Sequence, residues 1–262
     1  MKTYMILSGR ELIRNRLAIL LFFVIPSLFF ILTQLTMTNP EIVFKLPAIS
    51  EDTTIHVGQR TEALIFIGLA AVGVISSFLG LILSQKDILT TQRLIICGYR
   101  PSEIIVSKLF LLLAVVMIVG FYVAFLLRAF IRPVDLAGTA LAFTLGGYVY
   151  GCYGLLVGTL VRHELEGILL VVLLANVDVG WLQNPIYYTD AQNKLIIRLL
   201  PAFYPSQVSM ASVLTSFDTL VPYLLGTAYG TLLYVIAILI SRLRLRVHRQ
   251  SFRPVITHAD KG

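Results

Sequence analysis

The stretch that decides the fold is Ala63–Ser84, which reads ALIFIGLAAVGVISSFLGLILS and contains no charged side chain. A helix needs about 20 mostly apolar residues to cross a hydrocarbon core of ~30 Å. Four further runs meet this requirement, and they are Leu17–Met37, Leu109–Leu127, Leu136–Val161 and Leu220–Ile240. A sixth and shorter run, Gly167–Leu182, contains Asn176 and Asp178 and follows the compact polar break at residues 162–166. The sequence therefore predicts six transmembrane helices.

The composition of the whole chain agrees with this prediction. Of the 262 residues, 57% are hydrophobic and 13% are charged, and the mean hydropathy is +0.86. Soluble domains average about 45–50% apolar and about 25% charged residues, so a soluble domain and a disordered chain are both excluded. The net charge of +7 comes from basic residues that lie beside the apolar runs, which favours an anionic membrane surface over a nucleic acid as the partner. We expect an all-α polytopic membrane protein that binds no nucleic acid.

The distribution of Lys and Arg predicts the orientation. Fifteen of the 21 basic residues lie on the side that holds both chain ends, so the positive-inside rule places both termini in the cytoplasm. Arg128 and Arg132 lie in a turn on the other side and are exceptions to this rule. We expect an integral protein of a bacterial or archaeal plasma membrane. It would consist of an interfacial helix at residues 1–16, a six-helix domain at residues 17–240 and a basic cytoplasmic tail at residues 241–262.

Residues 1–16 are amphipathic when they are placed on a helix. Met5, Ile6, Leu12 and Ile13 share one side, and the basic and polar side chains occupy the other. Such a helix lies in the membrane interface with its basic face at anionic headgroups. The alternative is a basic flank to the first span. We expect anionic lipids to bind both this segment and the basic tail.

A long polar connection follows the second span. Gln85–Lys108 reads QKDILTTQRLIICGYRPSEIIVSK and exceeds the usual helix–helix connection of ~2–8 residues. It predicts a short helix over residues 87–97, which ends at Gly98, and a second helix that opens at Pro101 and Ser102. A helix–break–helix element of this kind would project into the cytoplasm and dock a partner.

The segment before the last span is also unusual. Gln183–Phe217 contains apolar pieces of only about 6–12 residues, which suit re-entrant or interfacial helices rather than spans. Its Tyr187, Tyr188, Phe203 and Tyr204 resemble an aromatic headgroup belt. We favour membrane contact for this segment, and the alternative is an ordinary external loop.

Motifs of enzymes are absent from the sequence. It contains no G-x-x-x-x-G-K-[ST] phosphate loop, no H-E-x-x-H, no G-x-S-x-G and no paired-cysteine motif. The four His residues are scattered, and Cys97 and Cys152 are expected at different depths, which argues against a metal set and a disulfide. We therefore predict no catalytic, cofactor-binding or metal-binding residue in this chain.

Asp178 is the most informative single residue. It follows Gly167 by eleven positions, so on a helix it lies roughly 16 Å into the bilayer. An ionisable group at that depth costs about 2.5–3.5 kcal/mol on insertion scales and faces protein or water. Three interpretations are open: a polar point on a substrate pathway, a hydrogen-bond clamp between helices, and the outer end of a short span.

Six glycines follow the small-x-x-x-small spacing that lets membrane helices approach each other closely. This spacing favours packing within the chain over a dimer seam. The glycines that we assign to helix packing are Gly147, Gly151, Gly154, Gly158, Gly226 and Gly230.

Two stretches and the overall plan resemble a known family, the permease of type-2 ABC exporters. Thr91–Phe110, TQRLIICGYRPSEIIVSKLF, resembles the coupling-helix region of that family, and Leu199–Leu214, LLPAFYPSQVSMASVL, resembles its outer re-entrant segment. One departure is that Gln92 stands beside Arg93 where the family commonly has an acidic residue. The resemblance covers essentially the whole chain and is carried by architecture more than by any single motif.

The resemblance implies a function. Two permeases, identical or different, would assemble with two separate ATPase subunits that bind ATP and Mg²⁺, so this chain itself would not be an enzyme. The pair would move a lipophilic or amphiphilic substrate outward, such as a drug, antibiotic, peptide or lipid. The coupling contacts would fall on Arg93, Tyr99, Arg100 and Glu103, and the substrate pathway on Phe66, Ser76, Ser77, Asn176 and Asp178.

Two other classes of function stay open on the sequence. A stand-alone channel or secondary transporter could use Asp178 as an ion or proton site, although no convincing internal repeat supports it. An intramembrane enzyme acting on lipid normally needs clustered Asp, His or Arg residues near one interface, and the predicted spans contain one carboxylate.

Overall fold

The computed structural model describes residues 9, 14, 16–85, 101–161, 163–184, 187–188 and 191–251. Within them, six helices are long and apolar enough to cross a membrane, which confirms the predicted number. Their bounds are α2 Arg16–Thr36, α3 Gln59–Gln85, α5 Pro101–Phe130, α6 Leu136–Leu160, α7 Glu164–Val177, which continues into the π-helix η1 Asp178–Leu182, and α11 Leu220–Ser251.

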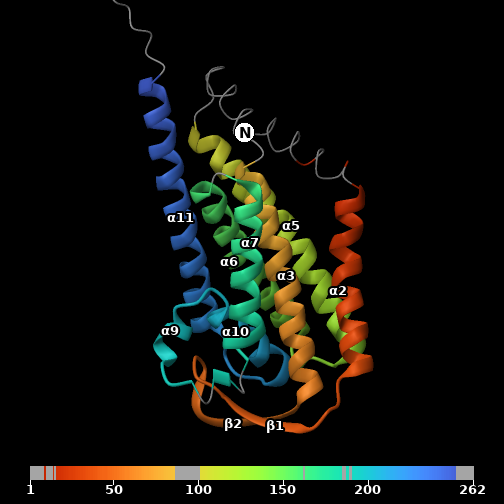
Figure 1. Ribbon diagram of the computed structural model, residues 1–262. Helices are drawn as coiled ribbons and strands as arrows, with labels where there is room; N and C mark the ends of the chain where they lie inside the picture. Colours follow the sequence, from red (N-terminus) through yellow and green to blue (C-terminus); the bar gives the residue numbers. More distant parts are fainter. Residues whose placement is uncertain are drawn as a thin grey trace, which may run out of the picture.

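The helices alternate in direction and create two distinct ends (Figure 1). At one end, here named the terminal end, α2 and α5 begin and α3 and α11 end. The opposite end, the hairpin end, holds two β-strands and the short helices α9, Lys194–Arg198, and α10, Phe203–Leu214. The predicted amphipathic helix at residues 1–16 and the predicted coupling segment lie largely outside the described residues. α11 continues through Ser251, into the segment that the sequence assigns to the tail.

A β-hairpin joins α2 to α3, and the sequence analysis did not predict it. β1, Glu41–Leu46, pairs antiparallel with β2, Ser50–Gly58. The side chains of β1 alternate, since Phe44 and Leu46 are buried while Val43 and Lys45 are exposed. This alternation is the period-2 signal of a half-buried strand. The expectation of an all-α chain therefore holds for the membrane-spanning part but not for this connection.

α3 and α6 form the centre of the bundle. In each of them 72% of the span is buried, whereas 17–39% is buried in the other four spans. Glycines permit this close packing, because a Cβ atom at Gly80 would overlap the backbone of Gly151, and one at Gly154 would overlap the backbone of Ser77. The exposed apolar side chains of α2, α5, α7 and α11 are those that a bilayer would cover.

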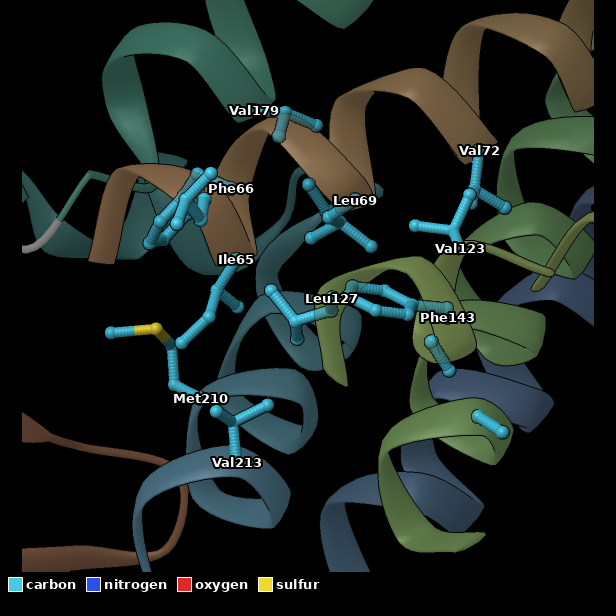
Figure 2. Packing of buried hydrophobic residues seen from close by; sticks show 14 of the residues in the cluster. Ile65, Phe66, Leu69, Val72, Val123, Leu127, Phe143, Val179, Met210 and Val213 are labelled. Atoms are coloured by element: carbon cyan, nitrogen blue, oxygen red, sulfur yellow. The ribbon is translucent and has the colours of Figure 1, made fainter. Parts of the chain in front are cut away.

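The main hydrophobic cluster lies where α3, α5, α6, η1 and α10 meet (Figure 2). The same cluster also contains buried residues of α2, both strands and α7, so it joins most elements of the hairpin end. Its labelled members are Ile65, Phe66, Leu69, Val72, Val123, Leu127, Phe143, Val179, Met210 and Val213.

α10 is a short helix buried in protein. Most of its residues from Phe203 to Val213 are buried, including four polar ones, Ser206, Gln207, Ser209 and Ser212. Its C-terminal end accepts backbone hydrogen bonds of 3.0 Å from Val134 and Asp135, in the turn between α5 and α6. The predicted short helix is thus present, while the contact of this segment with a bilayer stays a prediction.

Candidate functional site

The strongest candidate site is a buried polar network around Asp178. This residue is fully buried and lies where α7 ends and η1 begins. π-Helical turns are rare and are found mostly as single turns inside α-helices, often at functional sites. Here the wider turn places the carboxylate against α6 and the segment that leads into α10.

Three donors use both oxygens of the Asp178 carboxylate. Oδ2 accepts hydrogen bonds from the hydroxyl of Tyr150, at 2.6 Å, and from the backbone N–H of Ala202, at 2.8 Å. Oδ1 accepts from the side-chain amide of Gln183, at 2.9 Å. The donors come from α6, from the residue before α10 and from the end of η1. Because the site is buried, water could not easily replace the carboxylate as their acceptor if it were removed.

Gln183 extends the network to α9. Its Nε2 also donates to the carbonyl oxygen of Ile197, at 3.2 Å, and its backbone N–H donates to the carbonyl oxygen of Asp178, at 3.0 Å. Among the described residues, Gln183 Oε1 has no hydrogen-bond partner. The network therefore connects α6, η1, α9 and α10. These are the contacts of a hydrogen-bonded clamp between helices, and a role of Asp178 in a substrate pathway stays a prediction.

The other predicted pathway residues fall into two groups. Phe66, Ser76 and Ser77 of α3 are buried inside the chain, and Phe66 lies in the same cluster as Val179. Asn176 is exposed, and its side chain donates to the carbonyl oxygen of Val172, at 2.8 Å. The structure thus brings Phe66 close to the Asp178 region and separates Asn176 from it.

The two buried serines differ in their hydrogen bonds. Ser77 Oγ donates to the carbonyl oxygen of Gly73, one turn earlier. Ser76 Oγ has no hydrogen-bond partner among the described residues and lies against Gly147 of α6. Both serines therefore lie in the contact between the two central helices.

The six glycines assigned to helix packing all lie close to other elements of this chain. A Cβ atom added at each position would meet Val116 at Gly147, Leu112 at Gly151, Ser77 at Gly154, Ser84 at Gly158, Leu145 at Gly226 and Tyr148 at Gly230. Of the residues assigned to coupling, Arg93, Tyr99 and Arg100 lie outside the described residues. Glu103 lies in the first turn of α5.

Sequence reasoning missed three buried polar residues, two of which belong to the site. Tyr150 lies in the middle of a span, where a phenol normally needs a hydrogen-bond partner, and that requirement was the available signal. Gln183 gave no signal, because only the π-helical turn brings it against Asp178. Glu62 is the third: it lies in the first turn of α3 and is 2% exposed, and its Oε1 has no partner among the described residues. The apolar helices thus contain a second buried carboxylate.

The network provides hydrogen-bond acceptors and donors but no cluster of metal ligands. Among the described residues, no three His, Cys, Asp or Glu side chains gather closely enough to hold a metal ion. Comparison with known families finds no family model that matches the chain, and no curated protein matches it.

Proposed function

We propose that the chain is the permease subunit of an ATP-driven exporter. The observation that carries the proposal is the position of α3. This helix ends at Gln85, directly before the segment with the predicted coupling role, and it packs against α2, α5, α6, α7, η1, α10 and β2. A displacement of the connection at the terminal end would therefore reach almost every other element through one helix.

The rigidity of the central pair supports this transmission. α3 and α6 approach so closely at Gly80 and Gly154 that side chains larger than hydrogen would overlap the opposite backbone. Close-packed interiors transmit strain because they have few voids into which they can deform. α3 also packs against η1, so the same movement would reach the Asp178 network.

The charge distribution supports a partner at the terminal end. The topology predicted from the sequence assigns fifteen of the 21 basic residues to the side of both chain ends, and the sequence contains no phosphate loop. In the proposal, separate ATPase subunits bind ATP and Mg²⁺ and dock on residues 92–107. A second permease completes the pathway for a lipophilic or amphiphilic substrate.

The experiment is a pull-down of the tagged chain from mild detergent, followed by an ATPase assay on the purified complex. We expect a stoichiometric nucleotide-binding subunit that is lost in the triple variant Y99A/R100A/E103A. The matched control is E41A/R132A/Y187A, which removes the same three residue types from exposed positions at the hairpin end. The control should retain the ATPase.

Two results would contradict the proposal. One is a homogeneous complex, complete by mass, that contains no ATPase. The other is substrate or ion movement by the purified chain alone in liposomes, which would favour a stand-alone channel or secondary transporter. The hydrogen bonds at Asp178 argue against that alternative, because both carboxylate oxygens already accept bonds from the protein.

A further inference from the structure

A pocket with a strongly basic lining opens at the hairpin end. Its volume is about 460 Å³, which lies within the range of about 300–1,000 Å³ that small-molecule sites occupy. One wall is the β-hairpin, and the other is the segment around α9. The lining residues are Val43, Phe44, Lys45, Pro47, Thr54, Tyr188, Lys194 and Arg198.

Three of the eight lining residues that the structure describes are cationic, and none of these eight is acidic. Lys45 comes from the hairpin, while Lys194 and Arg198 come from α9, where their spacing of four residues places them on one face of the helix. The remaining lining is mostly apolar. A lining that combines cations from the hairpin and from α9 with apolar side chains is complementary to an anion that carries an apolar body.

Tyr188 holds the two cations of α9 in position. Arg198 Nε donates to its hydroxyl, at 3.2 Å, and Lys194 Nζ lies 5.7 Å from the centroid of its ring, within the range of a cation–π interaction. The ring of Tyr188 packs in turn against Phe203, the first residue of α10, with 6.2 Å between centroids. The positive charges are therefore anchored to the buried part of the bundle.

The surroundings of the pocket have the composition of a membrane interface. Leu195 and Ile196, on the other side of α9, are exposed, and so are Trp181 and Tyr187, whose rings pack edge to face with 6.1 Å between centroids. Exposed Trp and Tyr residues are typical of the headgroup level. A ligand in this pocket would thus lie beside lipid rather than in bulk water.

We propose that this pocket binds the anionic phosphate headgroup of a membrane amphiphile, with Lys45, Lys194 and Arg198 on the phosphate and the apolar lining against its glycerol and acyl part. Arg and Lys side chains form charge-assisted hydrogen bonds with phosphate that are stronger than neutral ones. The pocket lies at the hairpin end, away from the terminal end. This proposal therefore does not depend on the proposed function.

The test measures binding of short-chain phospholipids to the full chain in a neutral detergent. We expect dihexanoyl phosphatidylglycerol to bind more tightly than dihexanoyl phosphatidylcholine, whose headgroup has no net charge. In the triple variant K45Q/K194Q/R198Q, binding should weaken by roughly tenfold or more, because the charge-assisted contacts are lost.

The matched control is R60Q/R128Q/R132Q. It removes the same number of charges from the same end of the bundle, at positions that do not line the pocket. We expect it to bind phosphatidylglycerol as the parent chain does. Size-exclusion profiles and thermal unfolding of both variants serve as the check that they remain folded.

Three outcomes would overturn the proposal. Equal binding of the two phospholipids would show that charge does not select the ligand. Equal loss in both triple variants would assign the effect to diffuse surface charge. Binding of glycerol phosphate as tight as that of phosphatidylglycerol would identify a site for a soluble anion instead of a membrane amphiphile.

Discussion

At the scale of single residues, Asp178 is a fully buried carboxylate whose two oxygens both accept hydrogen bonds. Asp178 accepts hydrogen bonds from Tyr150, Gln183 and the backbone of Ala202. A carboxylate in an apolar environment is costly unless it is paired or hydrogen-bonded, and here the protein supplies the donors that water would otherwise provide. Asp178 therefore connects segments that are far apart in the sequence.

We predict that D178A destabilises the protein by about 3 kcal/mol, since it leaves the Tyr150 hydroxyl and the Ala202 N–H without an acceptor and Gln183 Nε2 with only the carbonyl oxygen of Ile197. Y150F removes only one donor and should cost about 1 kcal/mol. Thermal unfolding in detergent measures both effects. Full thermal stability of D178A would rule out a clamp, and a stable D178N variant that had lost transport would favour an ion or proton site.

At the scale of elements, the contact between α3 and α6 organises the bundle. The sequence spacing of glycines predicted close helix approach, and the structure identifies the partner helix of each one. The glycines are not equivalent, because some face a backbone and others face flexible side chains. At Gly154 a Cβ atom would overlap the backbone of Ser77, whereas at Gly226 it would meet side-chain atoms of Leu145 and Tyr204 at 3.0–3.1 Å.

We predict that G154A destabilises the protein more than G226A does. The first substitution forces α3 and α6 apart, which costs about 1–3 kcal/mol or more, as overpacking of a dense core does. In G226A only a small movement of Leu145 and Tyr204 is needed to make room for the added methyl group. Thermal unfolding of the two variants, measured in the same detergent, compares them, and equal stability would contradict the observed helix contact.

At the scale of the whole molecule, the alternating helices separate the terminal end from the hairpin end, which carries the β-hairpin, α9 and α10 (Figure 1). The positive-inside rule, applied to the sequence, predicts that the terminal end faces the cytoplasm. In that orientation the ATPase partner of the proposed function and the anion pocket lie on opposite sides of the membrane. The two proposals can therefore be tested independently.

We predict that a cysteine at His56 reacts with a membrane-impermeant maleimide in intact cells and that one at Glu164 reacts only after permeabilisation. Both positions are exposed, and they lie at opposite ends of the bundle. The parent for both variants lacks Cys97 and Cys152, so that only the introduced thiol reacts. The reverse labelling pattern would show the opposite orientation, in which the terminal end lies outside the cytoplasm.

The number of helices long and apolar enough to span a membrane was determined by the sequence alone, because each long apolar run satisfies its backbone hydrogen bonds internally as a helix. The importance of Asp178 was also visible, because an ionisable residue in such a run stands out by its cost. The alternation around Phe44 indicates a strand of the β-hairpin, but this short pattern is much weaker than the long apolar runs that indicate the helices.

Only the tertiary structure decided which side chains meet. Tyr150 and Ala202 are 28 and 24 residues from Asp178 in the sequence, so no local pattern encodes their meeting, whereas Gln183 is five residues away and meets Asp178 through the π-helical turn. The basic pocket likewise joins Lys45 to Lys194 and Arg198 across two connections that the sequence presents as unrelated loops. Periodicity and composition report how each segment partitions between water and lipid, whereas a polar site depends on long-range packing that brings the segments together.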